Sequence, residues 1–141
     1  MEKLEHIGIA VNDLAKANDL FARLLGREHY KIEEVASEGV NTSFFNVGGV
    51  KIELLEATGP SSPIAKFLGK RGEGIHHLAF EVTDIQEALA SYVARGFEVV
   101  HQTPKKGADN KLVFFLHPKT TNGVLIELVQ EVKSIDNNNN K

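Results

Sequence analysis

The chain has 141 residues, 16 basic and 19 acidic side chains and a formal net charge of −3. This length fits one domain, and the mixed charge excludes the broad basic surface that nucleic-acid binding requires. The sequence holds no apolar run of the ~18 residues needed to span a bilayer. It also has no cysteine, which excludes disulfides, thiol nucleophiles and sulfur ligands for a metal. A strand-like pattern begins by Leu4, so we expect no targeting peptide and a cytoplasmic location.

The first part of the chain predicts a β-α-β-β-β unit over about residues 1–57. Residues 4–11 alternate as a strand, with His6 on one face and Glu5 on the other. Asp13 can cap a helix whose apolar residues follow a 3.6-residue period up to Gly26. Strands are expected at residues 29–36, 41–47 and 50–55, the last two joined by a Gly-Gly turn.

The second part repeats this order over about residues 74–131. A linker and a short helix at 64–71 occupy residues 58–73. A strand at 74–82 leads to a helix capped by Asp84, and strands follow at 97–101, 112–116 and 123–130. Residues 1–134 are therefore predicted to form a single domain, and the Asn-rich tail at 135–141 is predicted to be disordered.

Two residue pairs recur at matching positions in the two units. His6 and His77 are 71 residues apart, and Glu53 and Glu127 are 74 apart. The difference fits a longer turn before the last strand of the second unit. The same order of strand, cap, helix and strand in both halves indicates an internal duplication.

The alternation directs these four side chains toward one concave face, while their aliphatic neighbours face the helices. A histidine or glutamate alone on a strand is usually structural or solvated, but the repeat favours a shared site. Buried carboxylates need a partner, and a divalent cation suits two imidazoles and two carboxylates. Such nitrogen and oxygen ligands fit Co²⁺, Ni²⁺, Zn²⁺, Mn²⁺ or Fe²⁺.

Two other histidines are placed by the same patterns. His76 would lie opposite His77 and face the core, where a bond to the backbone would satisfy it. His117, in the stretch F-F-L-H-P-K, would either line the cleft or cap a strand.

Six stretches together resemble the vicinal oxygen chelate superfamily and, within it, the methylmalonyl-CoA epimerase family. They are L-E-H-I-G-I-A-V at 4–11, K-I-E-L-L at 51–55, S-P-I-A-K-F-L at 62–68, G-I-H-H-L-A-F-E-V at 74–82, F-L-H-P-K at 115–119 and G-V-L-I-E-L at 123–128. The resemblance implies an α+β fold of two tandem βαβββ modules, whose curved eight-stranded mixed sheet forms a cup around a metal site. It also implies a homodimer and a metal held by His6, Glu53, His77 and Glu127. Co²⁺ is our first choice, with Zn²⁺, Mn²⁺ and Ni²⁺ as alternatives.

The activity implied is the interconversion of (2R)- and (2S)-methylmalonyl-CoA by proton transfer at C2. A metal that chelates the thioester oxygen and a carboxylate oxygen would stabilise the enolate. Glu127 is expected to be one acid/base; the other stays open between Glu53, which we prefer, a water and Glu38. Thr42 stands where some relatives have Glu. Thr42, His117 and Lys119 are the expected substrate-binding residues. Lys119 is the first choice for the phosphates of coenzyme A, ahead of Lys105, Lys106 and Lys111. The alternatives are a glyoxalase I-like lyase, a ring-cleaving dioxygenase and a metal-free small-molecule-binding protein of the same fold.

Overall fold

The computed structural model describes residues 3–132, so the predicted tail lies outside the described residues. Its mixed sheet has eight strands in the order β2-β3-β4-β1-β5-β8-β7-β6. The elements are β1 (Lys3–Ala10), α1 (Leu14–Leu25), β2 (Lys31–Val35), β3 (Val40–Val47), β4 (Val50–Ala57), α2 (Pro63–Arg71), β5 (Gly74–Glu81), α3 (Ile85–Ala94), β6 (Lys105–Lys106), β7 (Lys111–Leu116) and β8 (Ile126–Glu131), with 3-10 turns η1 (Ala36–Glu38), η2 (Ala108–Asn110) and η3 (Pro118–Thr120). The predicted α+β class and the two β-α-β-β-β units are confirmed.

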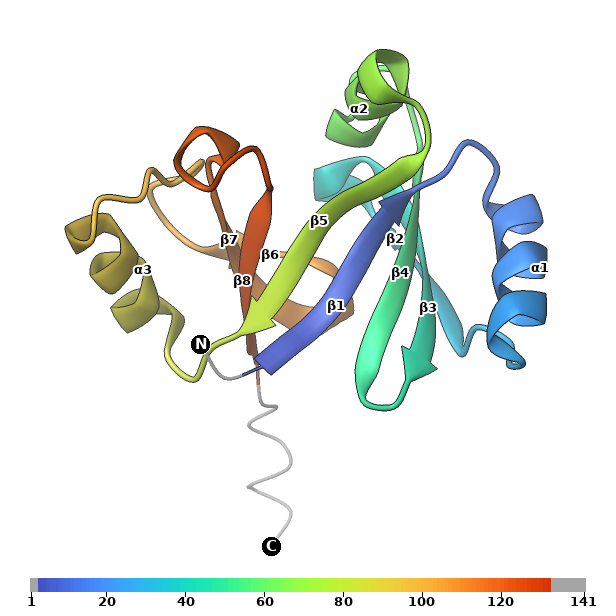
Figure 1. The fold of residues 1–141 in the computed structure, drawn as a ribbon, viewed down its shortest axis with the longest axis horizontal. Coiled ribbons are helices and arrows are strands. Elements are labelled where there is room, and N and C mark those ends of the chain that lie inside the picture. Colours follow the sequence, from blue (N-terminus) through green and yellow to red (C-terminus); the bar gives the residue numbers. More distant parts are fainter. Residues whose placement is uncertain (1–2, 133–141) are drawn as a thin grey trace, which may run out of the picture.

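The two units meet at the centre of the sheet, where β1 runs antiparallel to β5 (Figure 1). In each unit the first strand also pairs in parallel with the last, β1 with β4 and β5 with β8. Helix α1 lies outside one half of the curled sheet, α3 lies outside the other half, and α2 lies near one end of β5 (Figure 1). This matched arrangement is what a duplicated chain should give.

The helix caps fix where each helix begins. The Asp13 carboxylate accepts a hydrogen bond from the backbone N–H of Lys16 at 3.0 Å, and Asp84 does the same for Glu87 at 3.1 Å. Both aspartates stand in extended backbone just before the first helical residue, as N-caps do. The predicted caps are therefore confirmed.

The outward faces of the strands supply the hydrophobic core under the helices. Leu54 and Phe45 pack with Leu14 of α1, and Leu128 and Phe114 pack beneath α3. Because side chains alternate along a strand, burying Leu54 and Leu128 against helices turns the neighbouring glutamates to the concave side. The predicted orientation of the last strand in each unit is confirmed.

The strand predicted at residues 97–101 is wrong. Only an isolated bridge joins Val99 to Leu116, and the regular strand β6 comes later. The Phe97 N–H donates to the Tyr92 carbonyl at 3.0 Å, and the two rings lie 5.7 Å apart. Phe97 is therefore held by the end of α3, and pairing with β7 is limited to the backbone hydrogen bonds of Glu98 and Val100 on either side of Val99. None of the helices within residues 3–132 is long and apolar enough to cross a membrane.

Candidate functional site

Three side chains from the central strands converge on the concave side of the sheet. They are His6 on β1, His77 on β5 and Glu127 on β8, and all three are buried. The two Nε2 atoms lie 2.9 Å apart, and Glu127 Oε1 lies 3.1 Å from His6 Nε2 and 3.0 Å from His77 Nε2. Ala79 pairs with both His6 and Glu127, so its small side chain leaves the space that they fill.

These distances match what a metal ion requires. Two ligand atoms held at right angles, about 2.1 Å from a metal, lie about 3.0 Å apart. His6 Nε2, His77 Nε2 and Glu127 Oε1 are therefore close enough together to bind one ion. They form a possible ligand set of two histidines and one carboxylate, without sulfur.

Glu53 lies on the other side of the His6 ring. Its Oε2 is 3.2 Å from His6 Nδ1, so it joins Glu5 and His6 in a second possible ligand set. Burial, which the charge of His6 only partly offsets, raises the pKa of Glu53 to about 7. The structure therefore brings three of the four expected ligands into one triad and places the fourth beside it.

The buried charges in this cluster stabilise one another. Burial would lower the pKa of His6, but the charge of Glu53 and bonds to Glu127 and Glu5 raise it to about 10. Burial would likewise raise the pKa of Glu127, but the charge of His77 and bonds from both histidines lower it. The same carboxylates would also stabilise a divalent ion bound to the imidazole nitrogens in place of a proton.

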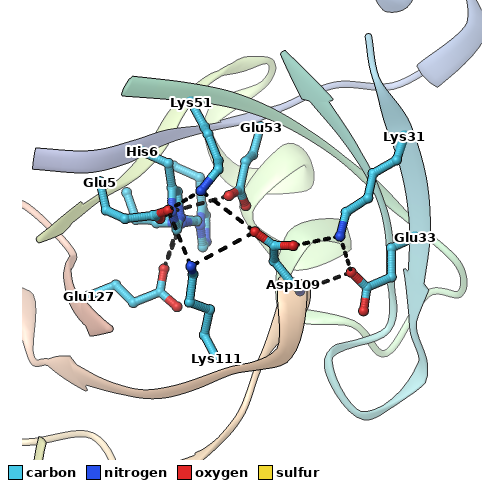
Figure 2. A network of polar contacts seen from close by, with 11 residues as sticks. Glu5, His6, Lys31, Glu33, Lys51, Glu53, Asp109, Lys111 and Glu127 are labelled. Atoms are coloured by element: carbon cyan, nitrogen blue, oxygen red, sulfur yellow. Dashed lines mark hydrogen bonds and ion pairs between the residues drawn. The ribbon is translucent and has the colours of Figure 1, made fainter. Parts of the chain in front are cut away.

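The prediction that Glu5 points away from His6 is wrong. In the β1–β5 pairing, Leu4 is opposite Phe80 and His6 is opposite Ala79, so Glu5 is an unpaired bulge residue. The bulge turns Glu5 into the concave side, where it is buried. There its carboxylate contacts His6 Nδ1 and accepts a hydrogen bond from Lys51 Nζ at 2.5 Å (Figure 2).

His76 was expected to face the core, and this prediction is also wrong. Gly8 pairs with His77 and Ile9 pairs with Ile75, which leaves His76 as a second bulge residue. Its Nδ1 lies 2.9 Å from His77 Nδ1, and its ring packs edge-on against Phe67 of α2. Burial lowers the pKa of His76 to about 4, so its ring is neutral.

The two bulges occupy equivalent positions of the repeat, each one residue before a histidine of the triad. Sequence alternation missed both because one extra residue reverses the facing of the side chains after it. A signal existed for Glu5, since a charged residue on a face otherwise made of Ile7, Ile9 and Val11 needs a special partner.

A network of charges extends from Glu5 toward the second unit (Figure 2). Asp109, in the loop before β7, lies 2.5 Å from Lys31 Nζ, 3.6 Å from Lys51 Nζ and 3.9 Å from Lys111 Nζ. Asp109 and Asn110 both have left-handed backbone, with φ of 61° and 56°, which is uncommon outside glycine. The loop is thus held over the first unit by charge pairs that sequence reasoning did not find.

A cavity opens beside the triad and takes its walls from both units. Apolar walls come from residues such as Leu55, Ile64, Val113 and Phe115, with the triad, Glu53 and Glu38 among its polar groups. Thr42 lines it too, and its buried Oγ1 has no hydrogen-bond partner among residues 3–132. Such a hydroxyl is available to a ligand.

The other two expected substrate-binding residues lie elsewhere. His117 stands at the N-cap of η3, where its Nδ1 accepts a hydrogen bond from the Lys119 N–H at 3.2 Å. Lys119 is exposed, and its Nζ lies 3.0 Å from Glu98 Oε1. Neither lines the cavity described above, so a role for either would be at the surface around it.

The family model described as the glyoxalase/bleomycin resistance protein/dioxygenase superfamily matches residues 5–115. The chain belongs to this superfamily. The match confirms the resemblance inferred from sequence and agrees with the paired β-α-β-β-β units.

Several proteins similar to this chain are epimerases. The ethylmalonyl-CoA/methylmalonyl-CoA epimerase of Cereibacter sphaeroides is 42% identical over 91% of this chain and 97% of its own length. The mitochondrial methylmalonyl-CoA epimerase of Dictyostelium discoideum is 41% identical over 92% of this chain and 78% of its own length. The crystal structure of methylmalonyl-CoA epimerase from Mycobacterium tuberculosis superposes with a TM-score of 0.90 at 36% identity, covering 96% of this chain and 91% of that one. These relatives confirm the expectation of an isomerase of the epimerase type.

Proposed function

We propose that this protein interconverts the 2R and 2S forms of methylmalonyl-CoA in a metal-dependent reaction. The observation that carries this proposal is the triad of His6, His77 and Glu127, which opens into a cavity built by both units. The similarity to epimerases of this substrate supports it. The triad would hold a divalent ion, with Co²⁺ as our first choice. Glu53 lies beside Nδ1 of His6 and would become the fourth ligand by moving to the Nε2 side of the ring. Bound there, the ion would polarise the thioester carbonyl and stabilise the charge that develops when C2 loses its proton.

Two carboxylates of the chain would move the proton. Inversion at C2 needs removal of the proton on one face and its return on the other. Glu127 on β8 and Glu53 on β4 come from different units and lie on opposite sides of the His6 ring (Figure 2). We assign Glu127 and Glu53 as the two acid/base groups. The apolar cavity walls would limit exchange of that proton with bulk water.

Three further features belong to this proposal. Lys119 and His117, outside the cavity, would meet the coenzyme A moiety, and Thr42 would donate a hydrogen bond to the acyl end. We also propose a homodimer in the cytoplasm. The mass of the purified protein in solution, measured by light scattering, tests the assembly.

Deuterium incorporation at C2 of methylmalonyl-CoA in D₂O tests the activity. We expect exchange with the metal-loaded protein and its loss after treatment with a chelator. Glu127→Ala should slow exchange by about 10³-fold or more, because it removes both a ligand and a base. Glu131→Ala, an exposed residue on the same strand, is the matched control and should exchange normally.

Two outcomes would overturn the proposal. Exchange at the wild-type rate in Glu127→Ala would remove this residue from the chemistry. Turnover of a glutathione hemithioacetal without C2 exchange would assign the site to a glyoxalase I-like lyase instead.

A further inference from the structure

Three lysines approach the concave side of the sheet, and their ammonium groups differ in how they are held. Lys31 Nζ lies 2.5 Å from Asp109 Oδ1, and Lys51 Nζ lies 2.5 Å from Glu5 Oε2. Lys111 Nζ is 3.7 Å from Glu5 Oε2 and 3.9 Å from Asp109 Oδ2. These last distances are ion pairs but are too long for hydrogen bonds. Within residues 3–132 the Lys111 ammonium makes no hydrogen bond.

Lys111 is also the most deeply buried of the three. It is only 9% exposed, and it lines the cavity that contains the triad. An ammonium group carries three N–H donors and is costly to remove from water without acceptors. Lys111 is buried, but its carboxylate partners are too distant to accept hydrogen bonds. Its ammonium group therefore has unused N–H donors in the wall of the cavity.

We infer that Lys111 binds the free carboxylate of the acyl group and so makes the site specific for 2-carboxyacyl thioesters. This inference rests on the proposed function, since it names the substrate feature that the same cavity selects. The carboxylate is attached to C2, the carbon that exchanges its proton, so it must lie in the cavity beside the triad. The phosphates of coenzyme A are separated from C2 by a long arm and are expected outside.

The arrangement also explains how the ammonium is kept in place. Lys111 begins β7 next to the loop that Asp109 fixes over the first unit. The carboxylates of Glu5 and Asp109 attract the ammonium without engaging it at hydrogen-bond distance. An incoming carboxylate can thus bond to Lys111 without first breaking a hydrogen bond.

Equilibrium binding of two acyl-CoA ligands to the metal-loaded protein tests this role. Methylmalonyl-CoA and propionyl-CoA differ only in the carboxylate, so the ratio of their dissociation constants reports on that group. We expect Lys111→Gln to weaken methylmalonyl-CoA binding by about 10- to 100-fold and to leave propionyl-CoA within about twofold. Lys111→Arg keeps the charge and should retain most of the preference.

Two other lysines serve as controls. Lys70→Gln, exposed on α2, should change neither ligand. Lys119→Gln should weaken both ligands alike if it meets the phosphates that they share. An unchanged ratio in Lys111→Gln, or equal weakening of both ligands, would assign Lys111 a purely structural role and overturn the inference. If Lys111→Gln does not fold, Lys111→Met retains the aliphatic stem and is judged by the same ratio.

The binding test is independent of turnover. If the wild-type protein prefers methylmalonyl-CoA through Lys111 but shows no C2 exchange, the proposed activity is refuted and the role of Lys111 in binding the carboxylate stands. If the protein exchanges the C2 proton and Lys111→Gln still prefers methylmalonyl-CoA, the proposed activity stands and the role of Lys111 in binding the carboxylate is refuted.

Discussion

At the residue scale, the orientation of His6 depends on its chain neighbour Glu5. The Glu5 carboxylate contacts Nδ1 of the His6 ring, which directs Nε2 toward His77 and Glu127. Lys51 in turn holds Glu5 at 2.5 Å, and the bonds from His6 and Lys51 lower the pKa of Glu5 to about 2 despite burial, which acts to raise it. A carboxylate on the second nitrogen of a ligand histidine fixes the ring and increases its basicity.

Glu5→Gln is therefore expected to weaken binding of Co²⁺ by about 10- to 100-fold. The amide keeps the shape of the side chain but removes the charge that orients His6. Titration calorimetry with the metal alone measures this without reference to turnover. Glu28→Gln, an exposed glutamate, is the control. Equal affinities in the two variants would show that Glu5 does not position the ring.

At the element scale, the close pairing of β1 with β5 builds the centre of the site. Gly8 lies opposite His77, and a Cβ at Gly8 would be only 2.2 Å from His77 Cε1. The His77 ring thus occupies the space that any other residue at position 8 would fill. It cannot readily move away, because Glu127 and His76 contact its two nitrogens.

Gly8→Ala should consequently displace the His77 ring and lower metal affinity by at least about tenfold, together with a loss of stability of about 1–3 kcal/mol from overpacking. Metal titration and thermal unfolding measure the two effects. Gly59→Ala is the matched control, since a Cβ there meets nothing within 4 Å. Normal metal affinity in Gly8→Ala would mean that the strands separate enough to accept a methyl group.

At the scale of the whole molecule, the site belongs to neither unit alone. His6 comes from the first unit, whereas His77 and Glu127 come from the second. The central strands β1 and β5 also pair across the two units. A metal ion bound at the triad would therefore link both halves.

We accordingly expect one cooperative unfolding transition, with or without metal, that shifts upward when metal binds. At a free metal concentration of 100 Kd, the stabilisation should be about 2.7 kcal/mol. Differential scanning calorimetry with and without chelator measures it. Two separate transitions, of which metal moves only one, would show that the units unfold independently.

Much of the fold could be read from the sequence because it depends on local patterns. The helix caps at Asp13 and Asp84 and the alternation that turns Glu53 and Glu127 inward are set by neighbouring residues. The repeat relates the two halves through matched positions along the chain. The strand at 97–101 could not be excluded this way, because the contact of Phe97 with Tyr92 depends on how α3 ends.

By itself the sequence determined the two-unit organisation, the concave placement of His6, His77, Glu53 and Glu127, and the family resemblance. The tertiary structure alone decided which groups surround them. A bulge depends on the register between two strands, so Glu5 and His76 could be assigned to the site only once β1 and β5 were paired. The place of Lys111 in the cavity wall likewise depends on tertiary structure, because the neighbouring loop with Asp109 lies over the first unit. Charged residues that meet across such long sequence separations leave no local pattern in the sequence. Their contacts could therefore be identified only in the folded structure.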